Sequence, residues 1–213
     1  MAARDSRTRL VRRAAKADLS LPDALADRLT AYLDLLLRWN RKINLTGFAD
    51  PDEAVDRLLI EPVLAARHVT GAGGRLLDIG SGGGSPAIPL YLALPDWDLV
   101  MVESKARKAA FLREAIRTLE LKRALVETAR FEELLARNGH GGTYSAISLR
   151  AVRVERSTLD VLAEFLSPDG LILLFRGSTG PAQIPAVEPL AWTGTYPLFD
   201  RLGSRLTVLR RVR

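Results

Sequence analysis

The chain has 213 residues, of which 47% are hydrophobic and 26% charged, with a formal net charge of +6 and no cysteine. This size and composition fit one globular domain with a modest extension, and they exclude disulfides, thiolate metal sites and cysteine nucleophiles. No stretch reaches the ~20 apolar residues that span a bilayer, and the first residues lack the apolar run of a secretory signal, so we expect a cytoplasmic protein with no membrane partner.

The first segment of the chain is strongly basic. Residues 1–16 hold six basic side chains and one acidic side chain, a net charge of +5. Concentrated positive charge is typical of proteins that bind a phosphate backbone, but also of a solvated tail that only keeps a protein in solution. The sequence predicts a basic, flexible arm over residues 1–18 and leaves both interpretations open. A second basic cluster closes the chain: Arg201, Arg205, Arg210, Arg211 and Arg213.

A helical segment is predicted over residues 19–70. Ser20 and Asp23 have the spacing of a capping box ahead of a long amphipathic helix, with a proline in the first turn. A second helix is expected to begin at an Asp50 cap, and Pro62 should kink or divide it.

From residue 71 onward, short apolar segments alternate with amphipathic ones. This pattern predicts an α/β fold over residues 71–213, with a mostly parallel sheet that has helices on both faces. The predicted strands are 75–80, 98–103, 124–128, 144–149, 170–175, 190–196 and 204–211, and the predicted helices are 86–94, 105–119, 131–137 and 157–166.

A glycine-rich loop follows the first predicted strand, in the sequence DIGSGGGS. Glycines allow a sharp turn and a close approach of the backbone to a ligand, at the sheet edge where open α/β folds bind ligands. The dinucleotide motif G-x-G-x-x-G would need its third glycine where this chain has Ser85. A nicotinamide-dependent oxidoreductase is therefore disfavoured, although it stays an alternative. The loop glycines in question are Gly80, Gly82 and Gly84.

Two acidic residues near this loop indicate the kind of ligand. Asp78, on the strand itself, would repel a pyrophosphate but suits a ligand with a cationic amino acid end. Glu103, at the end of the second predicted strand, can accept hydrogen bonds from both ribose hydroxyls. This pattern resembles the class I S-adenosylmethionine-dependent methyltransferases. The resemblance implies S-adenosylmethionine as cofactor and a Rossmann-like, seven-stranded sheet with its last strand antiparallel.

Further stretches resemble one family within that class. RWNRKINLTG (residues 38–47), DIGSGGGSPAIPL, VESKARKAAFLRE, ARFEEL, RAV and RLTVLRRV occur in this order along the chain. They are similar to the small-subunit ribosomal RNA guanine-N7 methyltransferases, the RsmG or GidB family. The resemblance implies cofactor contacts from the glycine loop out to Ser85, from Glu103, from Phe131 and Glu132, and from Arg150. The alternatives are a core anchor for Phe131, a helix-start charge for Glu132 and a surface ion pair for Arg150.

The chemistry of guanine N7 agrees with residues that the chain lacks. Methylation of a pyrimidine ring carbon usually needs a cysteine, and methylation of an exocyclic amine usually needs an Asn/Asp-Pro-Pro-aromatic loop; SLRAV follows the fourth strand instead. The N7 lone pair carries no proton and can attack a methyl donor without a general base, so positioning is enough. We therefore name no catalytic residue, and with two histidines and no cysteine we expect no metal.

The substrate side is expected at the end of the long helix and at two strand ends. Trp39 could stack on a base, or it could pack its helix against the sheet. The expected partner is ribosomal RNA or the small ribosomal subunit, bound by a monomer. The candidate substrate-binding residues are Asn40, Lys42, Asn44, Arg150 and Arg176.

The chain departs from the family pattern on this side. Leu58, Glu61 and Pro62 replace a polar trio, Arg176 stands where a lysine is common, and the basic tail after the last strand is absent. Two alternatives follow: a methyltransferase of the same family that acts on a different RNA or another substrate, and a non-catalytic RNA-binding module.

Overall fold

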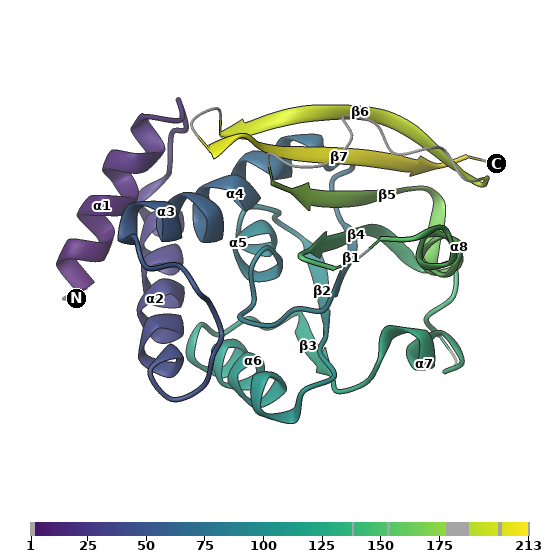
Figure 1. Ribbon diagram of the computed structural model, residues 1–213, viewed down its shortest axis with the longest axis horizontal. Helices are drawn as coiled ribbons and strands as arrows, with labels where there is room; N and C mark the ends of the chain where they lie inside the picture. Colours follow the sequence, from purple (N-terminus) through teal and green to yellow (C-terminus); the bar gives the residue numbers. More distant parts are fainter. Residues whose placement is uncertain (1–2, 138, 153, 178–187, 200–201, 213) are drawn as a thin grey trace.

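The computed structural model describes residues 3–137, 139–152, 154–177, 188–199 and 202–212. Its strands form one sheet in the order β3-β2-β1-β4-β5-β7-β6 (Figure 1). Strand β7 runs antiparallel to both neighbours, and the other pairs are parallel, which confirms the predicted sheet. The strands are β1 Gly74–Ile79, β2 Trp97–Val102, β3 Ala124–Glu127, β4 Tyr144–Arg150, β5 Leu166–Arg176, β6 Leu190–Phe199 and β7 Ser204–Arg211.

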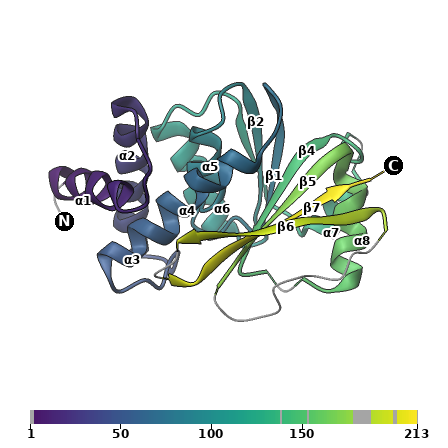
Figure 2. The same ribbon diagram turned by 90° about the horizontal axis from the view of Figure 1, so that it is seen from above.

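Helices cover both faces of this sheet. Figure 2 shows α1 to α6 on one side and α7 and α8 on the other. Consecutive strand residues point to opposite faces, so that Leu76 packs with the first group of helices and Leu77 with the second. The helices are α1 Ala3–Ala15, α2 Asp23–Asn40, α3 Pro51–Val55, α4 Glu61–Ala65, α5 Ala87–Leu92, α6 Ala106–Thr118, α7 Phe131–Leu135 and α8 Arg156–Phe165.

The helices before β1 share a hydrophobic core with the sheet. Leu10 of α1 and Leu33 of α2 belong to the same buried cluster as Leu76 of β1 and Phe111 of α6. The division that the sequence suggests at residue 71 therefore separates two kinds of secondary structure but not two hydrophobic cores.

Helix α1 occupies most of the segment for which the sequence predicts a flexible arm. Leu10 and Ala14, four residues apart, give this helix a buried face. Its arginines reach carboxylates on the next three helical segments, up to 43 residues away. These partners are distant in the sequence, so the run of basic residues alone does not show that most of this segment is a packed helix. The ion pairs join Arg7 to Asp23 and Asp27, Arg9 and Arg12 to Asp52, and Arg13 to Asp56.

Of the two N-terminal caps that the sequence predicts, for α2 and α3, only the second is present. The expected capping box of α2 is wrong, because the N-cap is Pro22 and no side chain caps the helix. The expected Asp50 cap of α3 is confirmed: its carboxylate accepts a hydrogen bond from the amide of Asp52 at 2.9 Å.

The helical segment after α3 is interrupted close to Pro62, as predicted. Residues Asp56–Ile60 form a π-helix, and α4 and a 3₁₀ turn, Ala66–His68, follow. In the π-helix the amide of Glu61 donates to the carbonyl of Asp56 instead of that of Arg57. Pro62 has no amide hydrogen to offer the carbonyl of Leu58. Two consecutive carbonyls, those of Arg57 and Leu58, thus lose their usual helical partners.

Candidate cofactor and substrate site

The glycine loop crosses the carboxyl end of β1 and is closely packed. Gly80, Gly82 and Gly84 have φ angles of +70°, +51° and +84°, in the left-handed region that favours glycine. A Cβ atom on Gly84 would lie 2.8 Å from the side chain of Ile88. The loop therefore requires glycine for its conformation and, at this position, also for its packing.

Glu103 lies just after β2 and is tied to the loop by its carboxylate. One oxygen accepts a hydrogen bond from the Gly82 amide at 2.9 Å, and the other accepts one from the Lys105 amide at 2.7 Å. Only 6% of the residue is exposed. Each carboxylate oxygen can accept more than one hydrogen bond, so Glu103 can hold the loop and still accept from a pair of ribose hydroxyls.

The carboxylate of Asp78 lies at the start of the loop, and one of its two oxygens has no hydrogen-bond partner among the described residues. The Ser148 hydroxyl donates to its Oδ1, whereas its Oδ2 is buried without a hydrogen-bond partner among the described residues. Burial raises the pKa of Asp78 to about 6. A buried acceptor without a partner is costly, and a cationic amino group would satisfy it. The site thus fits the amino acid end of S-adenosylmethionine.

Phe131 and Glu132 begin α7, beyond the carboxyl end of β3. The sheet places β3 next to β2, and the Glu103 amide donates to the Glu127 carbonyl at 3.0 Å. Phe131 is half-buried against the second core cluster, and Glu132 is exposed. The pair therefore lies at the same sheet edge as Glu103, with Phe131 contributing to the core as well.

Arg150, at the end of β4, is directed towards the π-helix. It donates from Nη1 to the carbonyl of Arg57 and from Nη2 to Glu61 at 2.9 Å, and its guanidinium lies 4.7 Å from the ring centre of Phe175. Its side chain is 17% exposed, so its ion pair is largely buried rather than on the surface. Burial lowers the pKa of Arg150 and raises that of Glu61. Its Nε is buried and has no hydrogen-bond partner within the part of the chain that the structure describes.

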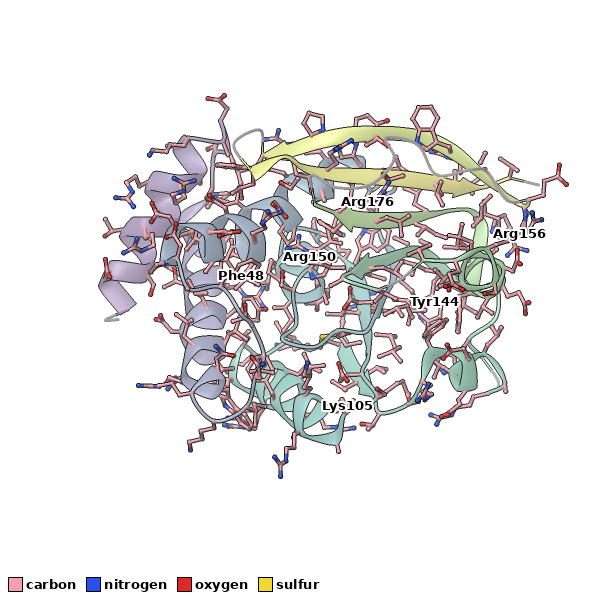
Figure 3. All side chains as sticks on the ribbon, viewed as in Figure 1. Phe48, Lys105, Tyr144, Arg150, Arg156 and Arg176 are labelled. Atoms are coloured by element: carbon pink, nitrogen blue, oxygen red, sulfur yellow. The ribbon has the colours of Figure 1, made fainter. Side chains whose placement is uncertain are left out.

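Both carbonyls that the helix leaves free are used by site residues. Arg150 takes the Arg57 carbonyl, and the Ser85 hydroxyl donates to the Leu58 carbonyl at 2.9 Å. Figure 3 shows Arg150 between the helical segment and the strand ends. The helical segment that contains Leu58, Glu61 and Pro62, where the sequence departs from the family pattern, is thus hydrogen-bonded directly to the cofactor loop and to β4.

The remaining substrate candidates lie in different environments. The Asn40 side chain holds the loop after α2, through bonds of 2.8 and 2.9 Å from the Leu45 and Thr46 amides and one of 3.0 Å to the Thr46 carbonyl. Lys42 and Asn44 are exposed on that loop. Arg176 is half-buried at the end of β5, one residue beyond the pairing of Arg150 with Phe175.

The Trp39 side chain packs against α6 rather than projecting into solvent. Its ring meets Phe111 of α6 edge to face, with the ring centres 5.7 Å apart, which supports the packing alternative.

The structure brings residues to the site that the sequence does not single out. The Tyr32 hydroxyl donates to the Gly83 carbonyl at 2.7 Å, and a Cβ on Gly83 would lie 3.0 Å from the Leu45 carbonyl. Phe48, on the same loop as Leu45, is 37% exposed (Figure 3). Of these residues only Phe48 carried a signal in the sequence, because it is an aromatic residue directly after the stretch RWNRKINLTG.

The described residues show neither a candidate metal site nor a helix that could span a membrane. They contain no group of three or more metal-ligating side chains. None of the helices in the described part of the chain is long and apolar enough to cross a membrane.

Comparison with known proteins identifies the family. The family model described as GidB, rRNA small subunit methyltransferase G, matches residues 25–190, which include the residues of the site from Asn40 to Arg176. The chain belongs to this family. It is therefore an S-adenosylmethionine-dependent methyltransferase, and the nicotinamide alternative is not supported.

Curated relatives agree with this assignment. The chain is 38% identical over 161 residues to the ribosomal RNA small subunit methyltransferase G of Xylella fastidiosa strain 9a5c, covering 76% of this chain and 73% of that protein. It is 38% identical over 176 residues to the enzyme of the same name from Stenotrophomonas maltophilia strain K279a, covering 83% and 80%.

Solved structures share the fold at low identity. The [4+2]-cyclase SpnF gives a TM-score of 0.61 at 14% identity, covering 87% of this chain and 93% of that one. A variant of MtNAS in complex with S-adenosylmethionine gives 0.58 at 15% identity, covering 89% and 78%. Because different proteins share this fold, the fold alone does not define the reaction.

Proposed function

We propose that the protein transfers the methyl group of S-adenosylmethionine to N7 of a guanine in small-subunit (16S) ribosomal RNA. The observation that carries this proposal is the family match over residues 25–190, because it spans the cofactor loop and the substrate candidates together. The proposal includes ribosomal RNA or the small subunit as partner, and the cytoplasm as the place of action.

The cofactor-binding residues follow from the geometry of the loop. In this proposal the open Oδ2 of Asp78 accepts from the amino group of the cofactor, and Glu103 accepts from its ribose hydroxyls. Phe131 and Glu132 border the adenine at the neighbouring strand end. Gly80, Gly82, Gly84 and Ser85 form the turn that lets the backbone approach the cofactor.

The reaction needs positioning more than proton transfer. S-adenosylmethionine supplies a sulfonium methyl group, whose bond to sulfur breaks as the N7 lone pair forms the new bond, and sulfur keeps the electron pair. No proton moves, so none of the side chains has to act as a base. What this chain must supply is orientation, and the bonds that join Ser85 and Arg150 to the π-helix keep that edge of the site in place.

Phe48 is the residue that we propose to stack on the target base. The loop touches Gly83 at Leu45, and three residues of extended chain cover at most ~10 Å, so Phe48 lies close to the cofactor loop. The residue is 37% exposed. Unstacked RNA bases are commonly held against aromatic side chains. The remaining substrate contacts in the proposal come from Lys42, Asn44 and Arg176, while Asn40 keeps their loop in shape.

A monomer is the proposed working unit. The large apolar side chains that are exposed in the described residues are few and are divided among α1, the loop after α2, β3 and the β6–β7 edge, so they form no large apolar patch that would indicate a subunit interface. They are Val11, Phe48, Leu125, Trp192 and Val212.

The test is transfer of labelled methyl groups to small ribosomal subunits from cells that lack this enzyme, followed by mapping of N7-methylguanine. Incorporation at one guanine supports the proposal. Incorporation only into another RNA favours the alternative substrate, and RNA binding without incorporation favours the non-catalytic module.

A further inference from the structure

Two groups of cations in this protein have different surroundings. On α1, four arginines contact carboxylates of Asp23, Asp27, Asp52 and Asp56. An arginine already paired with a carboxylate has less to gain from a phosphate, because the existing pair must be replaced. The N-terminal helix is therefore a poor candidate for the surface that attracts RNA, although its sequence is strongly basic.

The cations at the end of α2 are not paired in this way. Arg38, Arg41 and Lys42 are exposed and form no ion pair with any carboxylate of the described residues. They lie along a groove of about 700 Å³ between the end of α2 and α6. Figure 1 shows these two helices side by side, and the contact between Trp39 and Phe111 joins them.

Charged side chains from both α2 and α6 line the groove. On α6, Arg117 and Glu114 face the groove and are paired at 2.7 Å. The pKa of Glu114 is lowered, chiefly by its hydrogen bond to Arg117 and to a smaller extent by Arg38. The groove thus carries four cations and one carboxylate. Its other walls are Leu35, Trp39 and Thr118.

The groove is continuous with the loop that reaches the cofactor site. Arg41 and Lys42 start the loop, the Asn40 side chain fixes its shape, and Leu45 rests on Gly83. A ligand held in the groove could therefore extend along this loop towards the glycine loop. A polyanion with repeated phosphates fits this arrangement better than a single anion, because the cations are spread along the groove.

We propose that the groove between α2 and α6 binds the phosphate backbone of the RNA substrate. This inference rests on the proposed function and extends it from the reacting base to the path of the strand. Arg38, Arg41 and Lys42 make the phosphate contacts, and the paired Arg117 contributes to the field.

The test compares three double variants, measured for binding to an unmethylated transcript of the small-subunit RNA over a series of salt concentrations. Arg38→Gln with Arg41→Gln removes two groove cations. Lys122→Gln with Arg156→Gln removes two exposed cations, one from the turn before β3 and one from α8, and is the matched control for net charge. Arg7→Gln with Arg12→Gln removes two paired arginines of α1.

The groove variant should bind the transcript about tenfold more weakly at moderate salt. The slope of log K against log salt should become shallower by about 1.4 to 1.8, since each lost phosphate contact removes about 0.7 to 0.9. The other two variants should stay close to the unmodified protein, and thermal melting should show that all three are folded.

Equal affinities and slopes for the groove variant and the charge control would overturn the proposal. So would a groove variant that binds naked RNA normally but binds assembled subunits weakly, because the groove would then contact a ribosomal protein. Failure of the proposed function is separate: it would appear as groove-dependent RNA binding by a protein that transfers no methyl group.

Discussion

The Ser85 hydroxyl donates to the carbonyl of Leu58 at 2.9 Å, and so joins the cofactor loop to a helical segment that precedes the sheet. The carbonyl is available because Pro62, four residues further on, has no amide hydrogen. One residue earlier, the π-helix frees the Arg57 carbonyl, which Arg150 occupies. Two departures from a regular helix thus become two contacts of the site. The first prediction follows from this arrangement.

Removing the hydroxyl in Ser85→Ala should lower the free energy of unfolding by about 1 to 3 kcal/mol, since a buried carbonyl loses its partner. In a Pro62→Ala background the new amide can bond to Leu58, so the same Ser85→Ala change should cost clearly less. Chemical denaturation of the four proteins in this double-mutant cycle measures the difference. Strictly additive effects would mean that Ser85 does not replace the bond that Pro62 removes.

Asp78 should make cofactor binding depend on pH. Its pKa in the folded protein is about 6, above the value of ~3.9 in an unfolded chain. The stability that its bound proton gives is complete below the unfolded pKa and is lost as the pH rises through about 6. A cationic amino group prefers the ionised carboxylate, so S-adenosylmethionine affinity should fall as the pH drops below 6, by up to about tenfold per pH unit.

Calorimetric titration between pH 5 and pH 8 provides this test, with Asp78→Asn as the comparison. The variant should bind more weakly at pH 8 and lose the pH dependence around 6. A variant with the same pH profile as the unmodified protein would assign that profile to another group.

Glu103 should be required for cofactor affinity through its charge and its two backbone bonds. Glu103→Ala removes the acceptor of both the Gly82 and the Lys105 amides, and we expect S-adenosylmethionine binding to weaken at least about tenfold, equal to about 1.4 kcal/mol. Glu103→Gln keeps one carbonyl oxygen and should lose less. Equilibrium binding of the cofactor distinguishes the variants, and unchanged affinity in Glu103→Ala would remove the ribose assignment.

Phe48 should matter for the target base and not for the cofactor. Loss of one base–aromatic stack costs about 1 to 3 kcal/mol, so Phe48→Ala should lower kcat/KM for RNA about 5- to 150-fold, while Phe48→Tyr keeps most of the activity. Trp192→Ala removes an aromatic ring that is 39% exposed on β6 and serves as the control. Normal methyl transfer by Phe48→Ala would exclude the stacking role.

The sequence predicts the strands, the glycine loop and the acidic residues beside it, because these depend on local spacing. Asp78 is fixed by a strand and a turn that follow each other directly, and Glu103 by the end of the next strand. The family model matches most of the chain and confirms S-adenosylmethionine as the cofactor.

Contacts between distant segments could not be predicted in the same way. Arg150 finds its partners 89 and 93 residues earlier, in Glu61 and Arg57. The basic charge of α1 suggests an RNA-binding arm until the structure shows carboxylates beside it. Asn40 has the character of a base-contacting residue, yet its amide is used within its own loop. In each case the partner, and not the residue type, decides the role.

Methyl transfer from labelled S-adenosylmethionine to unmethylated small ribosomal subunits, and in parallel to their naked RNA, tests the central proposal most directly. We predict N7-methylguanine at a single position in the small-subunit RNA, and loss of that product with Glu103→Ala. Binding of S-adenosylmethionine with no methyl group transferred to either substrate would contradict the account.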